Sequence, residues 1–345
     1  MDRLLVQDLV LDELRINRSC TIDEEEVDDG FDSGSDDDKP NRSATVLIEA
    51  ANRVTSNITV GAEWQIDPND VERIELIAIG GFGEVYRGTW LGAPVAIKVV
   101  DKAKDKDGAL FRNELDVWFS LNHPQIVNLF GASDGEQRMC VCDVADVDKG
   151  HLGTCLANFD KKKIWKMLYQ TASALQCLHT RGILHGDLKG NIVLIKTDNR
   201  AQLTDFGLSF LMTGFQDTAP TTSAVRWKAP ECVQGHPVTS ISDVYALGML
   251  IVQAITGGIP WPDMEDDVAL RHELINYRQN LSYIRPEGFS DEEWGLVMRM
   301  YVFEKEERLE LSLVVKILGV FAFDKISYIR DRIFLSKMVH EWKNV

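Results

Sequence analysis

The periodicity of apolar residues changes along this chain, and that change constrains the fold more than any other feature of the sequence. Residues 71–100 alternate in the manner of strands broken by glycines, and strand-like runs return at 126–130 and 139–144. Helical spacing appears at 109–121 and dominates from residue 161 onward, at 164–178, 244–256, 267–277, 292–302 and 311–321. A β-rich front followed by an α-rich back predicts an α+β fold with two lobes and a cleft between them.

The first part of the chain differs in composition from the rest. The chain has 345 residues and a formal net charge of −17, and residues 23–38 hold ten carboxylates and no basic residue. Such a run repels itself and has little apolar surface to bury, so we expect it to be disordered. We divide the chain into an N-terminal arm of residues 1–62, a folded unit of 64–318 whose first lobe ends near 144, and a helical tail of 319–345.

Charge, cysteine spacing and hydropathy argue against several classes of protein. Nucleic acid and anionic membranes repel an acidic chain, so neither is expected as a partner. The six cysteines show no C-x-x-C spacing, which predicts reduced thiols in the cytoplasm, with the nucleus as the alternative. No run of 18 or more apolar residues is present, so no transmembrane span is expected. Residues 1–14 have helical spacing and either dock on their own domain or bind a partner.

A glycine-rich segment lies between two of the predicted strands. It consists of Ile79, Gly80, Gly81, Phe82 and Gly83. Glycines let backbone amides close over phosphate groups, although a tight hairpin needs glycines too. Lys98 follows Gly83 by fifteen residues, and Val85 and Ala96 lie on the strands between them. This context favours a nucleotide site, because the ammonium of Lys98 can pair with α- and β-phosphates.

Three carboxylates and a second lysine fit the same chemistry. Glu114 lies on the predicted helix, where it can pair with Lys98 and orient it. Asp187 lies in I-L-H-G-D-L-K, and Asp205 begins D-F-G eighteen residues later. Phosphoryl transfer needs one carboxylate to orient the acceptor hydroxyl and another to hold metal on the phosphates, which are the roles predicted for Asp187 and Asp205. Lys189 can neutralise charge on the γ-phosphate. Each residue alone could be a solvated surface charge, but the ordered series favours phosphoryl transfer.

Further motifs extend the series and establish a resemblance. They are A-P-E at 229–231, S-D-V-Y-A-L-G at 242–248, and Arg308. From about residue 70 to 318 the chain resembles a eukaryotic protein kinase. W-Q-I-D-P-N-D at 64–70 and V-R-W-K-A-P-E resemble the tyrosine-kinase-like group, most of whose members phosphorylate serine or threonine. The resemblance implies a bilobal fold, ATP in the cleft and Mg²⁺ as the metal.

The resemblance also implies structural roles for residues outside the nucleotide site. Glu231 and Arg308 would form a buried ion pair, and Asp243 would brace the catalytic loop. An apolar column of Phe206, His185 and Trp118 would join the two lobes.

Four positions depart from the family's pattern. Ala78 replaces the first glycine of the glycine-rich segment, Gly186 replaces the arginine of H-R-D, and Ala224 replaces a threonine. Ile192 replaces the asparagine that ligates the second Mg²⁺, and isoleucine offers no ligand atom. A loop one residue shorter would bring Asn191 into that role, so Asp205 and Asn191 are the candidate metal ligands.

These observations lead to one function and leave alternatives open. The leading interpretation is an ATP-dependent kinase that transfers the γ-phosphate to serine or threonine of a protein substrate. The runner-up is a pseudokinase, an ATP-binding scaffold in which Ile192 makes transfer weak or absent, and a third is an allosteric activator of another kinase. Either Cys142 or Val144 would guard the pocket behind the nucleotide. Ser33 and Ser35, each followed three residues on by aspartate, would suit an acidophilic kinase.

Overall fold

The structure is a computed structural model and describes most of the region from residue 63 to residue 323. The described ranges are 63–80, 83–102, 108–146, 149–157, 159–205, 210–211, 225–276 and 285–323. The expected N-terminal arm, its acidic run and nearly all of the expected tail lie outside the described residues.

The first lobe is built on a five-stranded antiparallel sheet with the order β1-β2-β3-β5-β4. The strands are β1 (Val71–Gly80), β2 (Gly83–Trp90), β3 (Ala93–Val100), β4 (Leu129–Asp134) and β5 (Arg138–Cys142), and a short 3₁₀ helix, η1 (Pro68–Asp70), precedes them. One helix, α3 (Ala109–Phe119), buries Phe111, Leu115 and Trp118 at helical spacing. This stripe packs α3 on the core, so polar residues elsewhere on α3 can serve the site.

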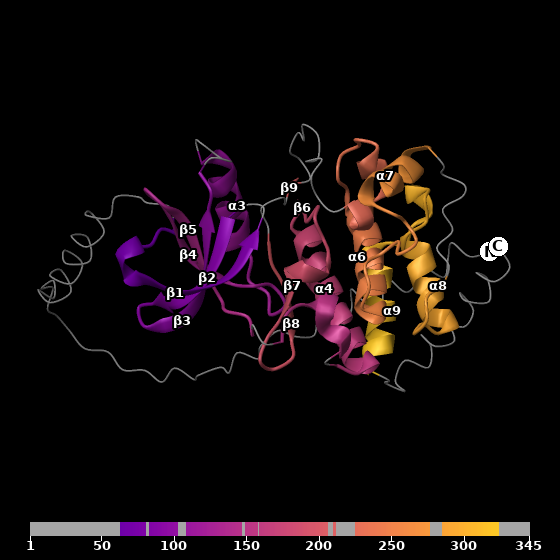
Figure 1. Ribbon diagram of the computed structural model, residues 1–345, viewed down its shortest axis with the longest axis horizontal. Helices are drawn as coiled ribbons and strands as arrows, with labels where there is room; N and C mark the ends of the chain where they lie inside the picture. Colours follow the sequence, from indigo (N-terminus) through magenta and orange to yellow (C-terminus); the bar gives the residue numbers. More distant parts are fainter. Residues whose placement is uncertain are drawn as a thin grey trace, which may run out of the picture. The chain divides into compact units, whose positions relative to one another are not determined.

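The second lobe is mainly helical (Figure 1). Its helices are α4 (Lys161–Thr180), α5 (Pro230–Val233), α6 (Ser240–Thr256), α7 (Asp267–Asn276), α8 (Asp291–Met300) and α9 (Leu311–Phe323). Short 3₁₀ helices are η2 (Leu152–Ala157), η3 (Gly190–Ile192), η4 (Val225–Trp227) and η5 (Lys305–Glu307). The α+β fold predicted from the sequence is confirmed, and each of the longer helices lies within a few residues of its predicted range. The helix α9 continues through the boundary expected at residue 318.

The central helix of this lobe is α6, and its sequence explains both its ends and its burial. A capping box between Thr239 and Ser242 satisfies the first backbone amides, and Gly257 with φ 70° ends the helix in the left-handed conformation. All residues from Ser242 to Ile255 except Gln253 are buried, so α6 is enclosed on nearly all of its faces. A helix that is apolar all round must lie inside, and α6 accordingly contacts α4, α8 and α9.

Two small two-stranded sheets support the segment that carries the catalytic motifs. They pair β6 (Ile183–Leu184) with β9 (Phe210–Leu211), and β7 (Val193–Ile195) with β8 (Ala201–Leu203). The strand expected at 126–130 begins only at Leu129, because Ile126 forms an isolated bridge with Leu203 of β8 instead. The Val127 amide donates to the Leu203 carbonyl at 2.9 Å, which ties the approach to β4 to this hairpin.

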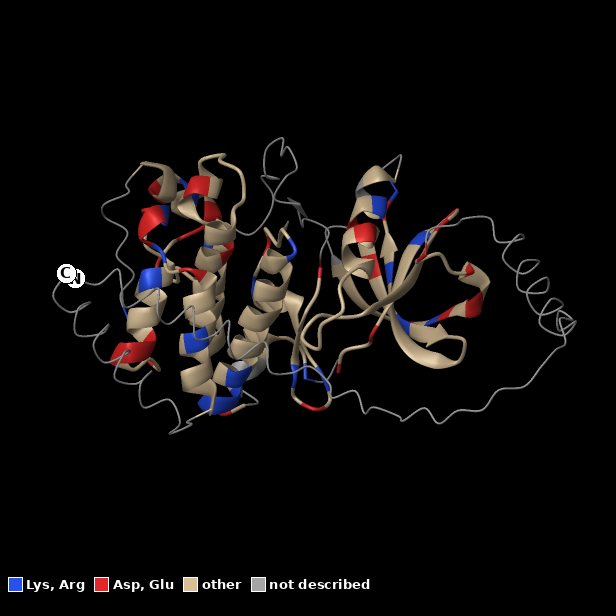
Figure 2. Ribbon diagram, turned by 180° about the vertical axis from the view of Figure 1, so that it is seen from behind, with Lys and Arg blue, Asp and Glu red and all other residues tan. Residues whose placement is uncertain are grey.

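Charged residues gather at the ends and outer faces of the helices (Figure 2). Lys161 at the start of α4 pairs with Glu293 at the start of α8, with 2.5 Å between Nζ and Oε2. Among the described residues, no helix is both long and apolar enough to span a bilayer.

Candidate active site

Three residues from distant parts of the sequence form a charged cluster between the sheet and the helical lobe. The Lys98 ammonium on β3 donates to Glu114 Oε1 on α3 at 2.9 Å and to Asp205 Oδ1 after β8 at 3.3 Å. Only 16% of the Lys98 side chain and 11% of the Glu114 side chain are exposed, against 35% for Asp205. The sequence expected Lys98, Glu114 and Asp205 at one site, and the structure brings them together.

The electrostatics of this cluster keep Lys98 and Asp205 ionised. Burial acts to lower the pKa of Lys98, but the charges of Glu114 and Asp205 outweigh it and raise that pKa well above its ordinary value. Burial likewise acts to raise the pKa of Asp205, and the Lys98 ammonium overrides it, so the pKa falls below its ordinary value. The cluster therefore presents a cation and a partly exposed carboxylate side by side at neutral pH.

Asp205 is held in a backbone conformation that non-glycine residues rarely adopt. Its φ is 64°, in the left-handed region. The adjacent Thr204 is fixed at both ends: its amide donates to the Ile192 carbonyl at 3.0 Å, and its carbonyl lies 3.3 Å from His185 Nε2. Neighbouring contacts thus impose a strained conformation on the residue that carries the carboxylate, a combination typical of functional sites.

The loop that carries Asp187 and Lys189 is held in place by hydrogen bonds to a buried carboxylate. Asp243 on α6, with 1% exposure, accepts from the amides of His185 and Gly186, both at 2.9 Å. The same carboxylate lies 2.8 Å from His179 Nε2. Within the loop, the Lys189 ammonium contacts Asp187 Oδ2, and both side chains are largely buried. The expected role of Asp243 is confirmed, and its contacts fix the loop in position for the two side chains.

The glycine-rich segment connects β1 to β2, and Gly83 at the start of β2 leaves no room for a side chain. Gly83 has φ 148°, and a Cβ there would lie 1.9 Å from the Val99 carbonyl oxygen on β3. Ile79 is 74% exposed at the end of β1, while Gly81 and Phe82 lie outside the described residues. Val85 on β2 lies opposite Lys98, so it is next to the charged cluster.

Comparison with known proteins agrees with this geometry. Residues 71–317 match the protein kinase domain family. This chain is a member of the protein kinase family. The match spans both lobes and every residue of the cluster.

Several relatives carry kinase names. The chain is 32% identical over 203 residues to a probable serine/threonine-protein kinase of Dictyostelium discoideum, covering 57% of this chain and 34% of that protein. It is 28% identical over 238 residues to human serine/threonine-protein kinase A-Raf, covering 66% and 38%. A putative serine/threonine-protein kinase/receptor of Acanthamoeba polyphaga mimivirus is 31% identical over 239 residues, covering 65% and 14%. The alignments thus span 14% to 38% of the relatives' lengths. A-Raf among them confirms the resemblance to the tyrosine-kinase-like group.

The kinase's expected metal-binding position is occupied by an apolar side chain. Ile192 is 3% exposed and belongs to the main hydrophobic core, and its carbonyl pairs with the Thr204 amide beside Asp205. Asn191, one residue earlier in η3, is exposed and its side chain makes no hydrogen bond within the described part of the chain. Ala224 lies outside the described residues.

The strand register distinguishes Cys142 from Val144, the two residues expected to guard the pocket behind the nucleotide. Lys98 lies opposite Cys140 and Ala96 opposite Cys142, so Cys142 shares a face of the sheet with Lys98. Val144 follows the end of β5 and has no partner in the sheet. Burial raises the pKa of the Cys142 thiol to about 12, so this side chain is a small neutral group.

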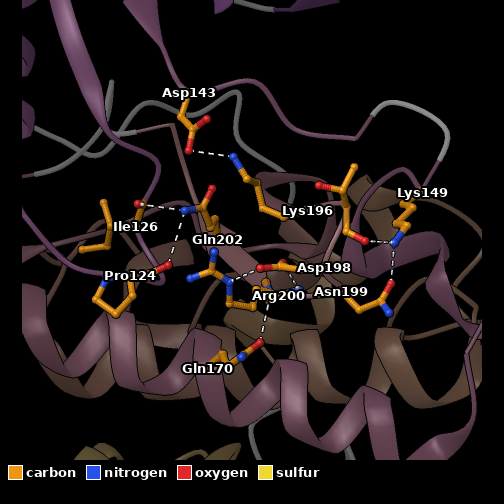
Figure 3. A network of polar contacts seen from close by, with 12 residues as sticks. Pro124, Ile126, Asp143, Lys149, Gln170, Lys196, Asp198, Asn199, Arg200 and Gln202 are labelled. Carbon is orange, nitrogen blue, oxygen red and sulfur yellow. Dashed lines mark hydrogen bonds and ion pairs between the residues drawn. The ribbon is translucent and has the colours of Figure 1, made fainter.

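Lys196, which belongs to no motif, joins the connection after β5 to the hairpin of β7 and β8 (Figure 3). The Lys196 ammonium lies 2.7 Å from Asp143 Oδ2 and donates to the Val144 carbonyl at 3.1 Å. Lys149 reaches the same hairpin through Asn199 Oδ1 at 2.6 Å. These contacts hold the segment that follows β5 in place. The one sequence signal for them is a lysine directly after the apolar strand β7.

The predicted structural pair is observed, and two residues predicted for the apolar column are buried. Arg308 donates to Glu231 at 2.6 and 2.8 Å, with no exposure of the arginine side chain. Trp118 is 2% and His185 0% exposed. Phe206 lies outside the described residues.

Proposed function

We propose that this chain is a protein kinase that transfers the γ-phosphate of ATP to serine or threonine hydroxyls of a protein. The observation that carries the proposal is the contact of Lys98 with both Glu114 and Asp205, because it joins the two lobes around a buried cation and an ionised carboxylate. The names of the relatives support serine and threonine as acceptors. Protein substrates, and not nucleic acid, suit a chain of net charge −17.

The residues of the site suit ATP and a divalent metal. Lys98 would pair with the α- and β-phosphates, and the backbone from Ile79 to Gly83 would close over them. Asp205 would hold the metal, which we propose to be Mg²⁺ because carboxylate, phosphate and water oxygens are its preferred ligands. Within the described residues, no cluster of three or more His, Cys, Asp or Glu could hold a metal ion without such outside ligands. The bound metal would neutralise charge that develops on the phosphates.

The remaining site residues would act on the acceptor. Asp187 would accept a hydrogen bond from the hydroxyl and orient its oxygen toward the γ-phosphate. Lys189, which contacts Asp187, would lie close enough to offset charge on the transferred group. Asp243 would keep the loop rigid through its bonds to the amides of His185 and Gly186, so that little reorganisation is needed.

We propose Asn191 as the second ligand of the metal. Its side chain is exposed and unengaged among the described residues, so its amide oxygen is available, whereas Ile192 is enclosed and apolar. If Asn191 does not serve, the missing ligand would cost about 3–4 kcal/mol in the transition state, or two to three decades of rate. The enclosure of Ile192 is therefore the observation that favours a pseudokinase as the second candidate.

We further propose that the protein works in the cytoplasm or nucleus, and that its N-terminal arm binds a partner. Cys140, Cys142, Cys177 and Cys232 are free thiols, which suits a reducing compartment.

The test of the proposed function is transfer of labelled phosphate from ATP to a protein in the presence of Mg²⁺. Transfer that Asp187→Asn abolishes supports a kinase. Nucleotide binding without transfer above the level of Asp187→Asn supports a pseudokinase.

A further inference from the structure

Gln253 is the one residue of α6 between Ser242 and Ile255 that is not fully buried, and its side chain faces the catalytic loop. Its Oε1 accepts a hydrogen bond from the Gly190 amide of that loop at 3.0 Å and another from Trp227 Nε1 of η4 at 3.1 Å. The two donors precede Gln253 by 63 and 26 positions in the sequence. One oxygen on the central helix of the lobe therefore joins three segments that are far apart in the chain.

The chemistry of an amide side chain fits this arrangement. A carbonyl oxygen has two lone pairs and can accept two hydrogen bonds, and both neighbours of Gln253 Oε1 are N–H donors. The buried amide of Gly190 begins the 3₁₀ helix η3, so no carbonyl of that helix can accept from it. Lys189, at the cap position of η3, makes no side-chain hydrogen bond to the helix. Gln253 thus satisfies a buried amide that the local sequence leaves without an acceptor.

Close packing leaves the Gln253 side chain and the loop little freedom to move. A Cβ on Gly190 would lie 2.5 Å from Gln253 Oε1 and 2.5 Å from the Cα of Gly153 in η2. A Cβ on Gly153 would in turn lie 2.6 Å from Gln253 Nε2. The two glycines therefore let η2 and η3 approach each other closely, and they enclose the side chain at both its oxygen and its nitrogen.

The second donor belongs to a segment that is itself firmly attached. Arg226, next to Trp227, is buried and donates to Asp267 of α7 at 2.8 Å. Because η4 is held in this way, the bond from Trp227 keeps the Gln253 amide in one orientation. The oxygen that accepts from Gly190 is therefore in place before any substrate arrives.

We propose that Gln253 is a positioning residue for phosphoryl transfer, because its bond to Gly190 fixes the part of the loop that carries Lys189 and Asn191. The inference rests on the proposed kinase function. Lys189 directly precedes Gly190 and Asn191 directly follows it, so a shift of Gly190 displaces both side chains. A displacement of about 1 Å at such groups costs up to about a hundredfold in rate. Gln253 acts through the backbone that it holds and not on the reacting atoms.

The first test compares phosphotransfer from ATP and Mg²⁺ by the wild type and Gln253→Met. Methionine is similar to glutamine in length and offers no strong acceptor. We expect kcat to fall by about tenfold to a hundredfold, while the Kd of ATP stays within about twofold because Lys98 and Asp205 are unaffected. Rates are divided by the concentration of protein that binds ATP, so a partly folded variant still gives an answer.

Gln170→Met is the matched control. Gln170 is 8% exposed, and its Oε1 accepts from the Ala201 amide of β8 at 2.9 Å. Its loss removes the same kind of bond from a backbone amide outside the catalytic loop, so kcat should stay within about threefold of the wild type. Gln253→Glu, whose carboxylate oxygens can accept from both donors, should retain most of the rate. An unchanged kcat in Gln253→Met, equal losses in Gln253→Met and Gln170→Met, or no recovery in Gln253→Glu overturns the proposal.

The second test separates this inference from the kinase function on which it rests. Hydrogen exchange at the Gly190 amide, followed by mass spectrometry in the absence of nucleotide, needs no catalysis. We expect exchange at least about tenfold faster in Gln253→Met than in the wild type, the ratio that loss of one hydrogen bond supports, and no change in Gln170→Met. Equal exchange in all three proteins overturns the proposal whatever their activity. Faster exchange in Gln253→Met, with no transfer by the wild type, contradicts the kinase function and supports the anchoring of Gly190 by Gln253.

Discussion

At the scale of single residues, the site depends on a lysine whose charge is maintained by its neighbours. Burial of Lys98 favours the neutral amine, and Glu114 and Asp205 reverse that preference. A raised pKa in the folded state contributes stability that is fully present below the ordinary value and is lost as pH rises through the folded value. Lys98 therefore remains charged across the neutral and moderately alkaline range, and its affinity for phosphate should not change there.

We predict that Glu114→Gln makes nucleotide affinity sensitive to alkaline pH. Without Glu114, burial lowers the pKa of Lys98 and the largest remaining opposition comes from Asp205, so the ammonium titrates at lower pH. Affinity should then fall by up to about tenfold for each pH unit above that pKa. The measurement is the Kd of ATP by calorimetry at pH 7.5 and 9.5. The exposed Glu136→Gln is the control, and equal pH dependence in Glu114→Gln and wild type would contradict the assignment.

At the scale of elements, the close approach of the β2 and β3 backbones determines which substitutions the glycine-rich segment tolerates. We predict that Gly83→Ala lowers the free energy of unfolding by about 3 kcal/mol and weakens ATP binding, because the new methyl group forces β2 and β3 apart. Gly92 is the matched control: its φ is also positive, at 81°, but a Cβ there meets nothing within 4 Å. Gly92→Ala should cost only about 1 kcal/mol in urea denaturation and leave ATP affinity unchanged. Similar losses in both variants would contradict the close packing at Gly83.

The 3₁₀ helix η3 carries both Asn191 and Ile192, so substitutions there can test which residue binds the metal. We predict that Asn191→Ala raises the concentration of Mg²⁺ that half-saturates phosphotransfer by about tenfold, because it removes an amide oxygen from the metal. Ile192→Val is the control, since it trims a buried side chain that offers no ligand atom and should cost about 1 kcal/mol of stability only. An unchanged Mg²⁺ requirement in Asn191→Ala would mean that Asp205 is the protein's only ligand.

Sequence periodicity predicted the longer elements and missed the short ones. The helices α4 and α6 carry 20 and 17 residues, enough for the apolar spacing to repeat several times. The strand β6 has two residues and η3 has three, too few for any period to be visible. The strand expected at 126–130 was misplaced because a buried Ile126 looks the same in a sheet and in an isolated bridge.

The site was predictable where motifs fix the residues and not elsewhere. Lys98 and Asp205 lie 107 positions apart, and only the motifs around them indicated that they meet. Lys196 and Gln253 lie in no motif, and their contacts depend on the tertiary arrangement of β7 and α6.

At the scale of the whole molecule, a buried ion pair joins α5 to the segment before α9. Arg308 also donates to the carbonyls of Val302 and Phe303, and its guanidinium lies 5.1 Å from the centre of the Tyr245 ring. Breaking a buried pair leaves the remaining charge without compensation, which is far more costly than losing an exposed pair.

We predict that Glu231→Ala lowers the free energy of unfolding by about 3 kcal/mol. This cost is at the lower end of those for breaking a buried ion pair, because the Val302 and Phe303 carbonyls still accept hydrogen bonds from Arg308. Asp198→Ala breaks an exposed pair with Arg200 and should cost less than about 1 kcal/mol. Urea denaturation of both variants measures the difference, and equal costs would contradict the structural role of Arg308.

The most direct test of the central claim is phosphotransfer from ATP and Mg²⁺ by the wild type, Asp187→Asn and Ile192→Asn. We predict measurable transfer by the wild type and a loss of at least about a hundredfold in Asp187→Asn, because the acceptor hydroxyl loses its carboxylate. Both proteins should retain ATP binding and the same unfolding transition. A wild type no more active than Asp187→Asn, together with transfer gained in Ile192→Asn, would contradict the claim and make the protein a pseudokinase disabled at residue 192.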